Sequence, residues 1–171
     1  MELQVQSHRW ESRMPDWPAA IVAGLVAGAV AMVIDLLWTT LMLGGNPWQT
    51  SHQVAAMLMG PELLQGPTHQ FQLGIVATAL LIHYGLGVLF GCLIAFIVTG
   101  FHYEGDLPML EIIGGLSGIA LYFINFYGFV RLFPWVAEMR SGAYLVEHLV
   151  FGMTAAMVYW KLARSGSVAT S

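Results

Sequence analysis

The chain has 171 residues, of which 57% are hydrophobic and only 9% are charged, and its formal net charge is −4. Soluble domains are about 45–50% apolar and about 25% charged, so this composition excludes an ordinary soluble domain. The sequence contains no P-loop, dinucleotide fingerprint, CxxC or HExxH motif, and no basic stripe that would bind nucleic acid.

Four long apolar stretches predict four transmembrane helices, at about 19–43, 71–99, 110–133 and 142–163. A bilayer core of ~30 Å needs about 20 apolar residues per helix, and each stretch reaches that length. The predicted fold class is therefore all-α, a polytopic membrane protein with a four-transmembrane-helix bundle. Residues 1–18 are expected to form a cytoplasmic or interfacial segment, 19–163 a single membrane domain, and 164–171 a tail.

The first stretch is too long for the apolar core of a signal peptide and carries Asp35, so we expect it to remain as an anchor. The connection after it, 44–70, opens with a Gly-Gly-Asn-Pro turn signal. It then predicts a short amphipathic helix at the membrane surface, with Val54, Met57 and Leu58 on its apolar side.

Each apolar stretch contains one polar side chain near its middle: Asp35, His83, Asn125 and His148. With a rise of 1.5 Å per residue, all four fall in the outer leaflet, within roughly 3–6 Å of the bilayer centre. Such residues are costly in hydrocarbon unless they face protein or water and have a partner. The sequence therefore predicts one buried polar cluster inside the bundle.

The two halves of the chain resemble each other. Gly24, Gly28 and Asp35 precede Gly114, Gly118 and Asn125 by a constant 90 residues, and a Pro-Trp pair follows each set. The second and fourth stretches share a His-x-x-x-Gly element that begins at His83 and His148. This pattern predicts two similar helical hairpins in parallel orientation. Small residues spaced by four, such as Gly87 and Gly91, are expected to let the helices pack closely.

The polar cluster has a structural and a functional interpretation. In the structural one, Asp35 and Asn125 each hydrogen-bond a histidine of a neighbouring helix and fix the register of the bundle. In the functional one, aspartate beside histidine handles protons or a ligand. Glu147 and Arg131 lie in the same leaflet and would extend such a path, or pair with each other at the interface.

A rival interpretation is a haem or metal site. His83 and His148, at matched depth on two helices, would ligate one haem b iron axially, with glycines clearing room for the porphyrin. Ten methionines invite a copper site, but they are scattered and form no MxxM cluster, so no cofactor is predicted as the first choice. The aromatic run 122–129 would line a quinone-like pocket or, as we prefer, serve as a packing and lipid-facing surface.

Arg9, Arg13, Lys161 and Arg164 account for four of the six basic residues, and they flank the first and last stretches. The positive-inside rule then places both termini in the cytoplasm. The single Cys92 allows no intrachain disulfide. Expected partners are the lipid bilayer and either a second copy of this chain or a larger membrane complex.

The segments GLVAGAVAMVIDLLW, GGNPW, HYGLGVLFG, INFYGFVRLFPW and EHLVFG resemble small four-span bacterial inner-membrane proteins of the YagU type, some of which carry the label sodium:proline symporter. The resemblance covers most of the chain and implies a bacterial inner-membrane location. It implies no mechanism, and 171 residues are too few for a true symporter of that name. We expect a non-enzymatic protein, either a small transport or proton-handling module or an accessory subunit of a membrane complex.

Overall fold

The computed structural model describes residues 14–66, 70–101 and 107–169, with backbone alone for 164–169. Within these ranges the fold contains α-helices and shorter helical turns but no β-strand, so the predicted all-α class is confirmed. The α-helices are α1 (Trp17–Leu37), α2 (Trp48–Met59), α3 (Leu73–Gly100), α4 (Leu107–Phe123) and α5 (Gly142–Ala169).

Three segments of the described chain are long and apolar enough to cross a membrane: Trp17–Met42, Leu73–Gly100 and Leu107–Arg131. They coincide with the first three predicted spans, and they support a membrane-embedded protein. The helix α5 covers the fourth predicted span and has 28 residues. It is more polar than the other three long helices, since Glu147 and His148 lie within it. That α5 also crosses the membrane stays a prediction.

Two of the segments continue past their α-helix as π-helical turns. Trp38–Met42 extends α1 and Ile124–Gly128 extends α4, which is followed by a 3₁₀ turn at Phe129–Arg131. Further 3₁₀ turns lie at Pro61–Gln65, after α2, and at Pro134–Met139, before α5. π-helical turns often accompany functional sites in helices. Here Trp38–Met42 follows shortly after Asp35, and Ile124–Gly128 contains Asn125.

Glycines bring the helices of each consecutive pair into backbone contact. A Cβ added to Gly24 of α1 would meet the carbonyl oxygen of Gly87 in α3. A Cβ added to Gly114 of α4 would lie 2.6 Å from the carbonyl oxygen of Gly152 in α5. Both crossings thus use positions that the predicted repeat pairs with each other. That the two hairpins are one duplicated unit stays a prediction.

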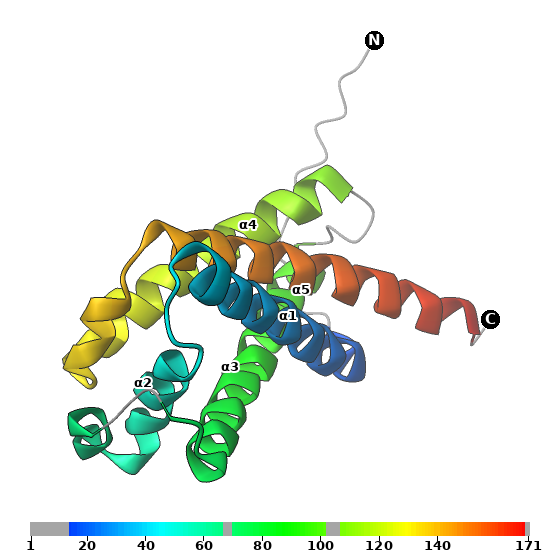
Figure 1. Ribbon diagram of the computed structural model, residues 1–171. Coiled ribbons are helices and arrows are strands. Elements are labelled where there is room, and N and C mark those ends of the chain that lie inside the picture. The colour runs from blue at the N-terminus through cyan, green and yellow to red at the C-terminus, as the bar shows by residue number, and fades with distance from the viewer. Residues whose placement is uncertain (1–13, 67–69, 102–106, 170–171) are drawn as a thin grey trace.

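The helices alternate in direction around a shared core. Figure 1 shows α1 and α5 running side by side, with α4 crossing α5 and α3 descending toward α2. At one end, the Tyr159 hydroxyl of α5 accepts a hydrogen bond from the Asp16 backbone N–H (3.2 Å) and contacts Thr99 Oγ1 of α3 (2.7 Å). The beginning of α1 and the end of α3 therefore meet on the last turns of α5.

The connection after α1 forms the predicted short helix, α2, which packs against α3 and buries His52, Ala55 and Ala56. Of the residues predicted on its apolar side, Val54 and Met57 are partly buried against hydrophobic clusters, whereas Leu58 is 68% exposed. The small side chains of Ala55 and Ala56 allow α2 to approach its neighbours closely.

Candidate functional site

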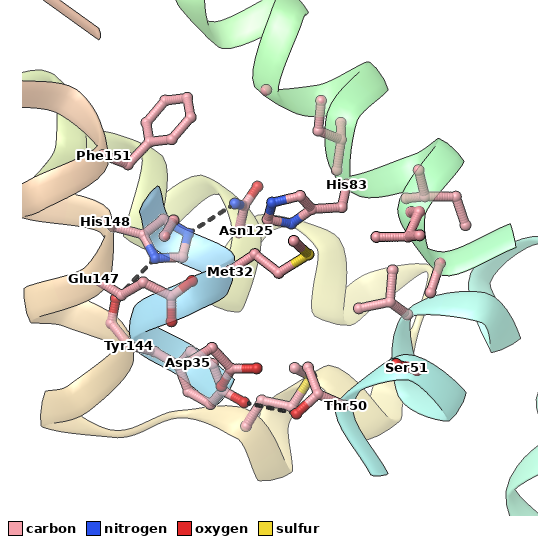
Figure 2. A pocket seen from close by; sticks show the side chains of 18 of the residues that line it. Met32, Asp35, Thr50, Ser51, His83, Asn125, Tyr144, Glu147, His148 and Phe151 are labelled. Atoms are coloured by element: carbon pink, nitrogen blue, oxygen red, sulfur yellow. Dashed lines mark hydrogen bonds between the residues drawn. The ribbon is translucent and has the colours of Figure 1, made fainter. Parts of the chain in front are cut away.

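The helices diverge on the side of the glycine crossings away from Tyr159, and a cavity of about 310 Å³ lies between them (Figure 2). Its walls come from α1, α2, α3, α5 and the π-helical continuation of α4. All four polar residues singled out in the sequence line it: Asp35, His83, Asn125 and His148. The structure thus brings them together around one space, and their function stays a prediction.

Asp35 projects from the last turns of α1 toward hydroxyl groups. Thr39 Oγ1, one turn further along, donates a hydrogen bond to its carboxylate Oδ1 at 3.4 Å. The hydroxyls of Tyr144 and Thr50 also face the carboxylate, and they lie 3.3 Å from each other. The direct Asp–His pairing expected from the sequence is not the arrangement among these side chains, although His83 is close enough to interact electrostatically.

His148 is held by two hydrogen bonds. Its Nδ1–H donates to the backbone carbonyl of Tyr144 at 2.7 Å, four residues earlier in α5. Its Nε2 consequently accepts a hydrogen bond from the Asn125 Nδ2–H at 3.0 Å. The expected pairing of Asn125 with a histidine is therefore found. The second amide atom, Asn125 Oδ1, is buried without a hydrogen-bond partner.

His83 forms a hydrogen bond with the backbone of the neighbouring helix α1. Its Nε2–H donates to the Gly28 carbonyl at 2.9 Å, across the crossing of α1 and α3. A Cβ at Gly28 would lie 3.4 Å from the same nitrogen, so glycine leaves room for the imidazole. The ring of Tyr84 stands edge-on to that of His83, with centroids 5.3 Å apart.

Of the two proposed extensions, only Glu147 belongs to the cavity. The Glu147 side chain lines it and interacts electrostatically with Asp35 of the facing helix. Arg131 lies in the exposed 3₁₀ turn after α4 and is not part of the wall. No ion pair between the two is formed in the described part of the chain, so the wall carries two carboxyl groups and no basic residue from this turn.

The aromatic run 122–129 divides between packing and the cavity. Tyr122 and Phe126 are buried and surround the His148 ring, with centroids 5.9 and 5.4 Å from it. Phe126 and Phe129 line the cavity, whereas Tyr127 is 49% exposed beneath the Arg140 guanidinium. Phe126 therefore belongs both to the packing around His148 and to the cavity wall, whereas Tyr127 lies on an exposed face.

The histidines use their Nε2 atoms for hydrogen bonds within the protein, His148 with Asn125 and His83 with the Gly28 carbonyl. Ligation of a haem iron through Nε2 would replace these two bonds, whereas the His148 Nδ1–H bond to the Tyr144 carbonyl is compatible with it. A haem site stays a prediction. Within the described ranges, no group of three or more His, Cys, Asp or Glu side chains is arranged to hold a metal ion.

Several lining residues escaped the sequence analysis: Thr50, Ser51 and Tyr144. Tyr144 lies four residues before His148 and so on the same face of α5, a signal that the spacing could have provided. Thr50 and Ser51 belong to α2, and only the packing of α2 on α3 brings them to the wall.

Comparison with protein-family models finds no matching family, and comparisons with curated proteins and with solved structures find no matching protein either. The functional argument therefore rests on the geometry of the cavity.

Proposed function

We propose that the protein is a four-span integral membrane protein of two similar hairpins, and that its cavity is the ligand- and proton-handling site of a small transport module. The observation that carries this proposal is the convergence of two carboxyl groups and two imidazoles on one cavity between apolar helices. Ionisable groups at such depth are functional candidates because burying them is costly. In this proposal the membrane is the bacterial inner membrane, and both termini are cytoplasmic.

The polar pair on α4 and α5 is suited to proton exchange. While His148 is neutral, its Nε2 accepts from Asn125 Nδ2–H, as in the structure. A half-turn of the amide would present Oδ1, which accepts a hydrogen bond from protonated Nε2. The buried Oδ1 has no other hydrogen-bond partner that such a rotation would break. One contact can therefore accommodate both protonation states of the histidine.

The facing carboxyl groups provide a second proton-binding element. Asp35 and Glu147 project into the cavity from α1 and α5 and interact electrostatically. Because like charges in a site of low polarity repel strongly, protonation of one of the two carboxyls relieves the repulsion. Thr50 and Tyr144 place hydroxyl groups next to Asp35, where they can pass hydrogen bonds on.

The test is proton flux into proteoliposomes that contain the purified protein, driven by a potassium diffusion potential and followed with an enclosed pH-sensitive dye. We expect flux above that of empty vesicles, and a strong loss in D35N and E147Q. The matched control is E111Q, since Glu111 is exposed near the start of α4 and does not line the cavity. Wild-type vesicles that are as proton-tight as empty ones would contradict the proposal.

An accessory subunit of a larger membrane complex is the second candidate. It is favoured by the end of the first segment, where Leu41, Met42 and Leu43 are 72%, 70% and 68% exposed. A stoichiometric partner retained in mild detergent would support this candidate, whereas a homo-oligomer alone would support the transport module. A haem-binding electron carrier remains the rival of another class, and a Soret band abolished in both H83A and H148A would favour it.

A further inference from the structure

The charged groups in the cavity wall have one sign. Asp35 and Glu147 line it, whereas none of the described Lys and Arg side chains does. Arg140 interacts with other groups: its Nε–H donates a hydrogen bond to the Phe126 carbonyl at 2.8 Å, and its guanidinium lies over the ring of Tyr127. A ligand that enters the cavity therefore meets carboxyl groups without a basic side chain in the same wall.

The charged side chains of the cavity wall are hydrogen-bond acceptors, and one neutral acceptor in the wall is unpartnered. Asn125 Oδ1 is buried and unpartnered, and the carboxylates of Asp35 and Glu147 add further acceptor oxygens. The donors are partly used, since Asn125 Nδ2–H binds His148 and His83 Nε2–H binds Gly28. A ligand with positive charge matches this balance better than an anion would.

Most of the rest of the wall is apolar, and α2, α3, α5 and the turns that follow α4 each contribute aromatic rings: Trp48, Phe90, Phe126, Phe129 and Phe151. Aromatic faces attract cations, and they do so more strongly where water is excluded. A small hydrated metal ion would gain little from such walls, and the described His, Cys, Asp and Glu residues form no metal cluster. The cavity volume of about 310 Å³ lies in the range typical of small-molecule sites.

Resting on the proposed function of the cavity as a ligand- and proton-handling site, we infer that its ligand is a lipophilic organic cation, an ammonium or phosphonium centre that bears apolar groups. The positive centre lies between the carboxylates of Asp35 and Glu147, and the apolar groups contact the aromatic wall. Negative charge on the carboxyls is needed for binding, so protons compete with the cation for the same site.

The titratable groups that face the cavity are Asp35 of α1, His83 of α3, and Tyr144, Glu147 and His148 of α5. Lowering the pH protonates the carboxyls, and the loss of their negative charge disfavours a cation. Cation affinity is therefore expected to fall as the pH falls, without any change in the apolar part of the site.

The test is equilibrium dialysis of the full chain in mild detergent against radiolabelled tetraphenylphosphonium, with empty detergent micelles as the blank. We expect saturable binding that excess unlabelled tetraphenylphosphonium displaces and that the isosteric anion tetraphenylborate does not. D35N and E147Q should each weaken binding roughly tenfold or more, because each removes one close charge. E111Q and E138Q, which change exposed carboxyls outside the cavity, should bind as wild type does.

Folding of each variant is checked by a monodisperse elution profile and an unchanged helical circular dichroism spectrum. The wild-type protein supplies a measurement that needs no variant: affinity at pH 8 should exceed affinity at pH 5. Absence of saturable wild-type binding, or binding that D35N, E147Q and pH leave unchanged, overturns the inference.

The outcomes also separate this inference from the proposed function. Carboxyl-dependent proton flux without cation binding would refute the organic-cation ligand and leave the proton-handling site standing. Carboxyl-dependent cation binding in protein that conducts no protons would support the ligand class and refute proton handling.

Discussion

At the scale of single residues, glycines determine how closely the two helix pairs approach. A Cβ on Gly118 would lie 2.8 Å from the carbonyl carbon of His148 and 2.9 Å from Leu149 Cα, both backbone atoms of α5. Backbone cannot rotate away as a flexible side chain can, so α4 and α5 would have to separate. The separation would also disturb the Asn125–His148 hydrogen bond that lies one to two turns further along α4.

We therefore expect Gly118→Ala to reduce the free energy of unfolding by about 1–3 kcal/mol. The measurement is reversible unfolding in mixed micelles, followed by circular dichroism. Gly85→Ala is the matched control, because a Cβ at Gly85 of α3 would meet no atom within 4 Å. Equal stability of both variants would show that the close crossing of α4 and α5 is absent in the membrane protein.

The polar positions of the site could be predicted from the sequence, and so could the pairing of Asn125 with a histidine, but the partners of Asp35 and His83 could not. A polar residue within an apolar stretch, such as Asp35 or His148, can be recognised without knowledge of the fold. Burying a polar side chain in lipid costs free energy whichever way it points. The choice of partner depends on distances of a few tenths of an ångström. His83 finds the Gly28 carbonyl and Asp35 finds hydroxyls, including one from α2, which no periodicity within a helix encodes.

At the scale of elements, Tyr159 joins three helices at the end away from the cavity. Its side chain is 2% exposed, and its hydroxyl contacts the Asp16 N–H at the start of α1 and Thr99 Oγ1 near the end of α3. Inter-helix hydrogen bonds in membrane proteins contribute modestly, but one hydroxyl here serves two neighbours. Its loss would leave a backbone N–H without this acceptor.

Tyr159→Phe should accordingly lower the free energy of unfolding by roughly 1–2 kcal/mol. Tyr127→Phe is the control, since Tyr127 is 49% exposed and its ring can still face Arg140 after the hydroxyl is removed. The two variants are compared in the same mixed-micelle unfolding assay. An unchanged Y159F protein would argue that the hydroxyl contacts do not connect α1, α3 and α5.

The three helices long and apolar enough to cross a membrane were predictable in approximate bounds, because long apolar stretches leave the backbone no other way to satisfy its hydrogen bonds in lipid. The π-helical turns at Trp38–Met42 and Ile124–Gly128 were not predictable, since apolar periodicity does not encode them. The side chains of α2 that are fully buried likewise depend on its contact with α3. Of these features, α2 and the turn at Ile124–Gly128 contribute to the cavity wall.

At the scale of the whole molecule, four spans with cytoplasmic termini predict which connections face outward. Single cysteines at positions 7, 51, 105 and 171, in a protein with Cys92 replaced by alanine, report this with a membrane-impermeant thiol reagent. Positions 7, 105 and 171 lie outside the described residues, and Ser51 lies in the cavity wall. We expect 51 to react from the outside and 7, 105 and 171 from the cytoplasm.

Glu62→Cys provides a better exposed reporter of the connection after α1, because Glu62 lies in an exposed 3₁₀ turn. It should react from the same side as position 51. Labelling of 51 and 62 from the cytoplasmic side would show that the charge-based orientation is wrong. Labelling of 7 and 171 from opposite sides would show that the number of spans is odd.

The central claim is that Asp35 and Glu147 exchange protons inside the cavity, and infrared difference spectroscopy on a pH jump measures this most directly. The wild-type protein in lipid should lose carboxylate bands and gain protonated-carboxyl bands on acidification, and D35N/E147Q should lack part of both sets. The control E111Q/E138Q should retain the bands that the cavity variant lacks. A D35N/E147Q spectrum identical to that of the wild type would contradict the account.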